Sequence, residues 1–387
     1  PESNVQFGEG GAGTFSDGKL YSQIKDPKHY GRKVLTEFVK AGAPEDILTE
    51  AHPHIGTFRL VTMVMSMRET IESLGGEYRF QTRVEDFEIE TAPDGERQIA
   101  GLHLSDGSLL PARHVIMAVG HSARDTFQIL YDRGVHIEAK PFAIGVRIEH
   151  PQSWVDTARY GQSAGNKILG PAAYSIAHKC SNGRTVYSFC MCPGGRVVAA
   201  TSEEGRVVTN GMSQYSRNER NANAGIVVGI TPADYPEGTL GGVALQRHWE
   251  RQAFVAGGGT YAAPTQLVGD FLAGVASTGL GSVTPSYMPG VRPTDLAQCL
   301  PDGGQRQPGN ELVRAIGEVG RIEDVAQPVP IAVEEDLAAG CSVADHVSGN
   351  DVVLSCRPTR SRRRPATSCC WARATIATCC RCSSTIT

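Results

Sequence analysis

The chain has 387 residues, 40% hydrophobic and 20% charged, which is enough for two domains with a buried core. Its 37 basic and 41 acidic residues give a formal net charge of -4, so no global attraction to nucleic acid or to an anionic membrane is expected. No apolar run approaches the ~20 residues of a transmembrane helix. The chain opens at Pro1 without the charged and apolar regions of a signal peptide, so we expect a cytoplasmic protein that acts on a small molecule.

The first hundred residues predict a loop followed by two helices. Residues 1–19 are rich in glycine and have no apolar periodicity. Asp26 is placed to cap a helix in which apolar residues recur at helical spacing as far as Val39. A second amphipathic helix is predicted over residues 58–74, where Gly75 and Gly76 end it.

The next segments predict a meander of three strands and then a fully apolar strand. Segments 82–90, 99–104 and 109–110 are separated by Asp-Gly turns, which are typical of hairpins. Residues 115–119 are a continuous apolar run that Gly120 ends, and this pattern predicts a strand buried on both faces. A helix is predicted directly afterwards, and open α/β sheets bind ligands where such a strand ends.

From residue 140 the pattern predicts shorter strands broken by Gly and Pro. Strands are expected over 142–148, 185–190, 196–201 and 226–230, and a helix over 244–256. The whole pattern predicts an α/β protein with a partial nucleotide-binding domain over residues 1–139 and an inserted β-rich (α+β) substrate domain over residues 140–300.

The C-terminal 87 residues differ from the rest. They contain one of the 25 aromatic residues, Trp371, and seven of the 11 cysteines follow residue 340. A basic nucleic-acid arm, a cysteine metal cluster and a mistranslated reading frame are the alternatives, and the last is favoured because the segment lacks both stacking aromatics and regular ligand spacing. We expect residues 301–387 to be disordered or mistranslated.

The opening loop concentrates five glycines between Gly8 and Gly18. Glycines permit positive φ and close backbone approach, so such a loop can line an anion or a flat ring. A flexible connector with the same composition is an equal alternative, and the loop lacks the GxxxxGK[ST] spacing of a Walker motif.

Longer strings carry a resemblance. NVQFGEGGAGTFSDGKLYSQIKDP, VIMAVGHSARDTF, KPFAIGVRIEHPQ, YSFCMCPGG, TSEEGRVVTNGMSQYSRNERNANAGIVVGI and PSYMPGVRPTDL follow one another in order. Over residues 1 to about 300 the chain resembles the bacterial FAD-dependent proteins identified as NAD(FAD)-utilising dehydrogenases. The resemblance implies a glutathione-reductase-like FAD domain, FAD as cofactor, and NAD(P)H or a substrate as electron donor.

The resemblance also implies positions that contact FAD. The Gly-rich loop would face the flavin and pyrophosphate, one strand residue would meet the adenine, and a strand end with the following helix would flank the dinucleotide. The residues implied are Gly10, Gly11, Gly13, Thr14, Ser16, Asp17, Lys19, Val84, Ala118, Gly120, His121 and Arg124. A surface position is the alternative for His121 and Arg124.

The chain departs from this family pattern at both ends. A strand with GxGxxG usually precedes the resembling region, and a second Gly-rich FAD loop usually follows it. Neither is found before Pro1 or after Leu300. On this reading the chain is an N-terminally truncated fragment, and we expect it to retain little or no FAD after gel filtration.

Two further groups are candidates for chemistry. Cys190 and Cys192, two residues apart on a predicted strand, would point to one face and are weak candidates for a catalytic dithiol. Buried unreactive thiols are the favoured alternative, because an i, i+2 pair is difficult to bridge. The polar segment 213–223 could bind a polar or carboxylate-bearing substrate, or it could be a solvated loop with local turns. Its candidate residues are Ser213, Tyr215, Arg217, Asn218 and Arg220.

These features predict an FAD-dependent oxidoreductase that transfers a hydride between an unknown substrate or NAD(P)H and flavin. The sequence places no general base. A non-catalytic flavin-binding or regulatory protein is the competing prediction, because a fold does not determine a function.

Overall fold

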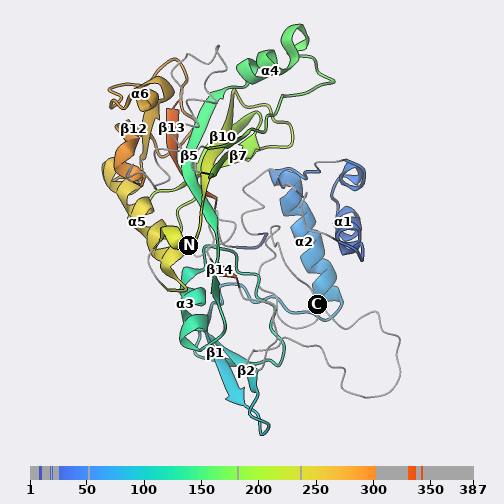
Figure 1. Cartoon of the computed structure of the whole chain (residues 1–387). Coiled ribbons are helices and arrows are strands. Elements are labelled where there is room, and N and C mark those ends of the chain that lie inside the picture. Colours follow the sequence, from blue (N-terminus) through green and yellow to red (C-terminus); the bar gives the residue numbers. More distant parts are fainter. Residues whose placement is uncertain are drawn as a thin grey trace. The chain divides into compact units, whose positions relative to one another are not determined.

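The computed structural model describes residues 8–10, 18, 20, 26–50, 53–180, 183–235, 238–301, 330–336 and 341–342. The chain divides into two compact units. Figure 1 shows the helices and strands of the chain, coloured by residue number. Unit 1 contains Gly18–Glu138 and unit 2 contains Ala139–Gly340. The described part of the chain contains both helices and strands, and the strands often follow one another directly, so the fold is a mixed α/β fold.

Unit 1 begins with a small helical core. Its elements are α1 (Tyr30–Lys40), the short 3-10 helix η2 (Glu45–Leu48) and α2 (Thr57–Ser73). Phe38, Ile47 and Leu60 are buried together between them. Asp26 accepts hydrogen bonds from the backbone N–H groups of Tyr30 and Gly31, although the N-cap position of α1 is His29 and the helix begins later than predicted.

The predicted meander forms an antiparallel sheet in unit 1. Strand β1 (Val84–Thr91) pairs with β2 (Arg97–Leu104), and β2 pairs with β3 (Leu109–Pro111). Helix α3 (Arg124–Asp132) contributes Leu130 to the core that contains Phe87 and Leu102. A salt bridge between Arg133 and Asp86 joins the end of α3 to β1.

Residues 115–119 do not form the buried strand that their composition predicts. The segment has no regular secondary structure, and although Val115 is buried, Ile116 is 71% exposed. A strand exists only where its backbone groups pair with a neighbour, and no described strand lies against this segment. The apolar run is therefore present without the sheet that its pattern requires.

Unit 2 is organised around a seven-stranded sheet with the order β12-β11-β13-β5-β10-β7-β6. All neighbours are antiparallel except β11 and β12. Its strands are β5 (Phe142–Pro151), β6 (Ala177–Lys179), β7 (Thr185–Cys192), β10 (Asn221–Ile230), β11 (Ala263–Leu267), β12 (Val291–Pro293) and β13 (Pro330–Asp336). The long pairing of β5 with β10 runs over ten residues of each strand and forms the centre of the unit.

Helices and a hairpin complete unit 2. They are α4 (Gln152–Tyr160), η3 (Gly161–Ser163), the hairpin strands β8 (Gly195–Ala199) and β9 (Thr209–Ser213), η4 (Pro232–Asp234), α5 (Gly241–Ala256), α6 (Val268–Ala273) and η5 (Leu296–Cys299). Two further strands have two residues each: β4 (Glu138–Ala139) lies where the sequence passes from unit 1 to unit 2, and β14 (Cys341–Ser342) belongs to unit 1.

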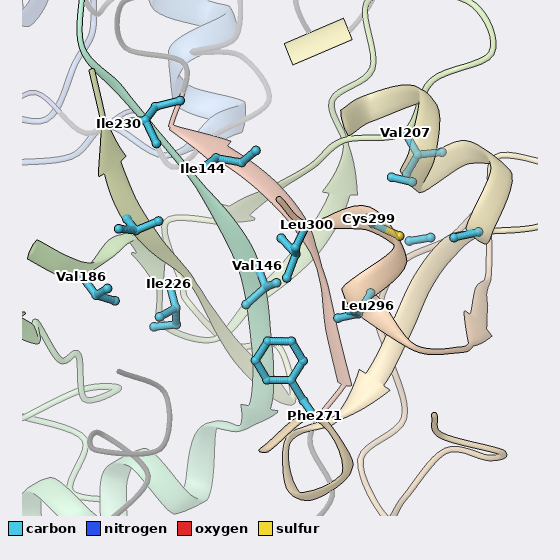
Figure 2. Close-up of a cluster of buried hydrophobic side chains, with 14 of the residues drawn as sticks. Ile144, Val146, Val186, Val207, Ile226, Ile230, Phe271, Leu296, Cys299 and Leu300 are labelled. Atoms are coloured by element: carbon cyan, nitrogen blue, oxygen red, sulfur yellow. The ribbon is translucent and has the colours of Figure 1, made fainter. Parts of the chain in front are cut away.

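One face of β5 and β10 carries the main hydrophobic core. Ile144 and Val146 from β5 and Ile226 and Ile230 from β10 point into a cluster that Leu296 also enters (Figure 2). Because strand residues alternate between faces, the residues between these apolar ones must point to the opposite side of the sheet.

The C-terminal segment differs from the expectation at one place. Residues 330–336, within the segment expected to be disordered or mistranslated, form β13 and pair with β5 and β11. Within residues 301–387 the structure describes 301, 330–336 and 341–342, and the remaining residues, including Trp371 and the cysteines after Cys341, lie outside the described residues. None of the helices in the described part of the chain is long and apolar enough to cross a membrane.

Candidate functional site

The face of β5 and β10 opposite the core carries polar side chains that are almost completely buried. Arg147 and Glu149 come from β5, and Asn221 and Asn223 come from β10. The antiparallel register places Glu149 opposite Asn223 and Arg147 opposite Gly225, so the four side chains occupy one end of the strand pair. A buried polar group is stable only when it is hydrogen-bonded, so this cluster is a specific arrangement rather than a solvated surface.

Arg147 is the centre of the cluster, with 1% of its surface exposed. Its Nη1 donates to Oδ1 of Asn223 at 2.6 Å and to the carbonyl oxygen of Cys190 at 3.4 Å. Its Nη2 donates to Oδ1 of Asn210, on β9, at 3.5 Å. Side-chain Nδ2 of Asn223 is buried and has no hydrogen-bond partner within the described residues. The site thus combines a buried guanidinium with an amide donor that remains available.

Glu149 organises the neighbouring part of the same face. Its Oε1 accepts from Nδ2 of Asn221 at 2.7 Å, and both carboxylate oxygens accept from the backbone N–H of Ser286 at 3.1 Å. Asn221 and Arg220 also donate to the carbonyl oxygen of Thr284. These contacts fix the 284–286 segment against the end of β10.

Strand β7 contributes a β-bulge to the cluster. The register between β7 and β10 shifts between Asn223 and Gly225, which lie opposite Cys192 and Phe189. Cys190 lies at this shift and has a φ of 45°, in the left-handed region that favours glycine. Bulges redirect strand residues and are common beside functional sites. Here the bulge presents the Cys190 carbonyl to Arg147.

The two cysteines have different surroundings. Cys192 is buried, with 1% of its surface exposed, whereas Cys190 is partly exposed. Neither is in a disulfide, and Sγ of Cys192 donates to the carbonyl oxygen of Cys190 at 3.2 Å. The bulge also interrupts the regular alternation from which we predicted that both thiols point to one face. A catalytic role for Cys190 or Cys192 remains a prediction.

The turn after Cys192 is held from three sides. The backbone N–H of Gly194 donates to Oε1 of Gln152 at 2.7 Å, at the beginning of α4. The Ser213 hydroxyl donates to the carbonyl oxygen of Pro193 at 2.8 Å. The backbone N–H of Glu219 donates to the carbonyl oxygen of Gly194. The bulge and the turn are therefore parts of one rigid assembly.

An aromatic and imidazole pair lies beside the cluster. His150, on β5, is stacked on Tyr174 with ring centroids 5.5 Å apart. Burial lowers the pKa of His150 to about 4, so its ring is neutral at physiological pH. Burial also raises the pKa of the Tyr174 hydroxyl, although the positive charge of Arg147 opposes this shift. The buried face therefore carries the guanidinium of Arg147 and the carboxylate of Glu149, whereas His150 and Tyr174 beside them stay neutral.

The predicted substrate residues are not gathered at one place by the described contacts. Ser213 is buried in the turn contact, and Arg220 binds Thr284 and the side chain of Asn221. Tyr215 and Asn218 are exposed, and Arg217 has a φ of 47° in the turn between β9 and β10. A substrate-binding role for these residues stays a prediction.

The predicted cofactor residues lie in unit 1, and part of the loop is described. Gly8 and Gly10 have φ values of 124° and 80°, which only glycine adopts readily, and Gly10 is buried. Glu9 between them forms an ion pair with Arg68 of α2 at 2.7 Å. Burial nevertheless raises the pKa of the Glu9 carboxyl. The remaining loop candidates lie outside the described residues: Gly11, Gly13, Thr14, Ser16, Asp17 and Lys19.

The other cofactor candidates are described. Val84 is the first residue of β1, and Ala118 lies in the unpaired apolar segment. Gly120 has a φ of 76°, and a Cβ at this position would meet no atom within 4 Å, so the backbone is open there. His121 follows, and Arg124 is 96% buried at the beginning of α3. An open glycine before a helix start is a geometry that suits a phosphate group, and FAD binding by these residues stays a prediction.

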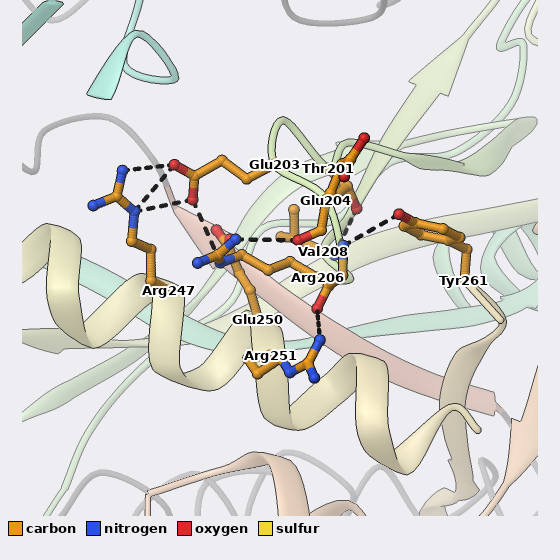
Figure 3. A network of polar contacts seen from close by, with 10 residues as sticks. Thr201, Glu203, Glu204, Arg206, Val208, Arg247, Glu250, Arg251 and Tyr261 are labelled. Atoms are coloured by element: carbon orange, nitrogen blue, oxygen red, sulfur yellow. Dashed lines mark hydrogen bonds and ion pairs between the residues drawn. The ribbon is translucent and has the colours of Figure 1, made fainter. Parts of the chain in front are cut away.

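A polar network in unit 2 stabilises the loop between β8 and β9. Arg247 of α5 forms a bidentate contact with Glu203, and Arg251 donates to the carbonyl oxygen of Gly205 (Figure 3). Tyr261 accepts from the Gly205 N–H through its hydroxyl oxygen. These contacts bind the loop to α5, and they give the network a structural role.

Most residues of the buried cluster lie outside the predicted site. Arg147, Glu149 and Asn210 belong to no predicted group, whereas Asn221 and Asn223 lie at the end of the predicted polar segment 213–223 without being among its candidate residues. A pattern that could have found them is the polar residue at every second position of an otherwise apolar strand, as in VRIE and NANA. Polar residues on the buried face of a strand require hydrogen-bond partners, so this pattern indicates a defined set of polar contacts at that place.

Comparison with known proteins agrees with a relationship to flavoproteins. Residues 141–320 match the model of the family described as FAD-dependent protein, C-terminal domain-like. An uncharacterized protein of Clostridium beijerinckii is 48% identical over 303 residues, which are 78% of this chain and 55% of that protein. The chain therefore spans about half the length of this curated relative. The family match covers the bulge, the turn and the Arg147 cluster, and it supports an FAD-dependent protein family.

Proposed function

We propose that this chain is part of an FAD-dependent oxidoreductase that transfers a hydride between a small-molecule substrate or NAD(P)H and flavin. The observation that carries the proposal is the family match over residues 141–320 together with the buried cluster inside it. A buried arginine beside a strained bulge is costly, and such costs are retained most often at functional sites.

The proposed division of roles follows from the chemistry of each group. FAD, when bound, supplies the two-electron chemistry. In unit 1, Gly10, Gly120, His121 and Arg124 would hold its phosphates and ring through backbone N–H groups and positive charge. In unit 2, Arg147 provides a fixed positive charge and Asn223 an amide donor, which suit an anionic or carbonyl oxygen of a substrate.

A protein that binds flavin without catalysis is the alternative, and one experiment separates the two. The Clostridium relative is purified, its flavin content is determined after denaturation, and NADH or NADPH is then added without oxygen. We expect bound FAD whose visible absorption is lost on reduction and returns with an artificial acceptor. Absence of FAD from the relative would overturn the proposal, and bound FAD without any turnover would favour the binding role.

The buried cluster has its own test in this chain. The variants Arg147→Met and Arg147→Lys are compared for stability and for protection of β5 and β10 against hydrogen exchange. Lysine keeps the charge but not the planar set of donors, so both variants are expected to lose the Asn210 and Asn223 contacts. We expect a loss of about 3 kcal/mol or more in each case, measured by chemical denaturation, because polar partners are left buried and unsatisfied. A loss below about 1 kcal/mol would show that the Arg147 contacts contribute little to stability, and the cluster would then not support the proposed function.

A further inference from the structure

Asn210 and Gly211, neighbours on β9, share a hydrogen bond between side chain and backbone. The backbone N–H of Gly211 donates to Oδ1 of Asn210 at 2.8 Å. Because Oδ1 is one C=O bond of about 1.2 Å from the side-chain carbon Cγ, that carbon lies within about 4 Å of the Gly211 nitrogen. A glycine has no Cβ to obstruct an approach between these two atoms. A small rotation of the side chain therefore brings an amide carbon onto a backbone nitrogen.

The pairing of β8 with β9 leaves this nitrogen outside the ladder of backbone hydrogen bonds. The N–H of Ala200 donates to the carbonyl oxygen of Val208, whereas the N–H of Val197 donates to the hydroxyl oxygen of Ser286. Hydrogen-bonded and non-hydrogen-bonded pairs alternate along antiparallel strands, so Val197 and Gly211 form a non-hydrogen-bonded pair. The N–H of Gly211 thus points away from β8, and the strand pairing does not hold it.

The guanidinium of Arg147 contacts the same side-chain oxygen. Its Nη2 donates to Oδ1 of Asn210 at 3.5 Å, while Nη1 is held by Asn223 and by the carbonyl oxygen of Cys190. A carbonyl oxygen becomes negatively charged when its carbon is attacked, and a fixed positive donor beside it stabilises that charge. The nucleophilic nitrogen and the donor that activates the carbonyl therefore meet at one side-chain amide.

We propose that Asn210 is a site of spontaneous deamidation, in which the backbone nitrogen of Gly211 attacks Cγ of Asn210. The new C–N bond closes a succinimide ring, the bond from Cγ to Nδ2 breaks, and the proton of the Gly211 nitrogen leaves with Nδ2 as ammonia. Water then opens the ring and produces an aspartyl or isoaspartyl residue. One water enters and one ammonia leaves, so no oxidant or reductant is needed. Asn210 is half-buried, which allows water to reach the ring.

The product places a carboxylate beside Arg147. A carboxylate oxygen accepts a stronger, charge-assisted hydrogen bond from a guanidinium than an amide oxygen does. The added negative charge lowers the net charge of the cluster by one, so an anionic group would bind there more weakly. This last consequence rests on the proposed function, whereas the deamidation does not, and its test contains neither flavin nor substrate.

The reaction is followed in labelled water. The chain is incubated at neutral pH in water enriched in oxygen-18, either folded or unfolded in guanidinium chloride, and is then digested in ordinary water. Each conversion before digestion adds about 3 Da to the peptide that contains the modified residue, which mass spectrometry measures. Asn182, the other asparagine that glycine follows, reports the rate of such a pair in the unfolded chain. We expect Asn210 to convert faster in the folded chain than in the unfolded chain, by about tenfold, because folding holds the reacting atoms together.

Two variants separate activation by Arg147 from mobility of the strand. Arg147→Met removes the donor to Oδ1, so the rate at Asn210 in the folded chain should fall by about tenfold or more. Ser286→Ala removes the hydroxyl that binds Val197, opposite Gly211, and keeps the Arg147 contact, so the rate should stay that of the parent chain. Hydrogen exchange in β5 and β10 shows whether each variant is folded during the incubation.

Three results would overturn the proposal. One is a rate at Asn210 in the folded parent chain equal to or below that in the unfolded chain, because the strand would then only protect the amide. Another is an unchanged rate in folded Arg147→Met. The third is a rate that rises in Ser286→Ala, which would assign the reaction to a loosened strand. The comparison of folded and unfolded parent chain decides the proposal even if Arg147→Met does not fold.

Discussion

Gly211 shows how closely the residues of the buried cluster are packed. A Cβ at this position of β9 would lie within 3.0 Å of Asn223 Oδ1, Arg147 Nη1 and Cys192 Sγ. We expect Gly211→Ala to destabilise the protein by about 1–3 kcal/mol, because the cluster is rigid and buried. Gly229→Ala on β10 is the matched control, since a Cβ there would meet nothing within 4 Å. Urea denaturation of both variants checks this, and equal losses would show that the cluster can move apart.

His150 predicts how stability depends on pH. Burial lowers its pKa from 6.5 to about 4, so below pH 6.5 the unfolded chain binds a proton that the folded chain does not. The stability that the neutral, buried His150 ring allows is therefore fully present above pH 6.5. As the pH falls from 6.5 towards 4, the free energy of unfolding decreases by about 3 kcal/mol. We expect His150→Gln to flatten the denaturation free energy measured across this window. His248→Gln is the control, because His248 is exposed although it also packs on an aromatic ring, Trp249. An unchanged slope in His150→Gln would contradict the assignment.

At the scale of elements, the bulge in β7 predicts a reversal of the usual preference between glycine and alanine. The φ of 45° at Cys190 costs an alanine about 1–2 kcal/mol but costs a glycine little. We therefore expect Cys190→Gly to be more stable than Cys190→Ala by about 1 kcal/mol. At Cys192, which has ordinary strand geometry, Cys192→Gly should be less stable than Cys192→Ala by about 0.5–1 kcal/mol. Thermal denaturation of the four variants measures the two differences, and the same sign at both positions would exclude backbone strain at Cys190.

Element by element, the success of the sequence prediction follows the range of the interactions involved. Helix α2 is observed at residues 57–73 against the predicted 58–74, because its apolar stripe and terminal glycines are local features. Helix α4 has few apolar residues and follows a strand directly, so periodicity did not indicate it.

The contact between Arg147 and Asn223 joins residues 76 positions apart, and no local pattern specifies which partners meet. Residues 115–119 have a strand's composition, but a strand also requires a neighbour.

At the scale of the whole molecule, the division into two units predicts that damage to one core does not spread to the other. Leu102 is 1% exposed in the core of unit 1, and Gly211 lies in the polar cluster of unit 2. Leu102→Ala should cost about 2–5 kcal/mol and should lower hydrogen-exchange protection in β1 and β2 while β5 and β10 keep theirs. Gly211→Ala should have the opposite pattern, since domains with separate cores unfold as separate cooperative units. A uniform loss of protection across both units in either variant would mean that they unfold together, and the chain would then behave as one cooperative domain.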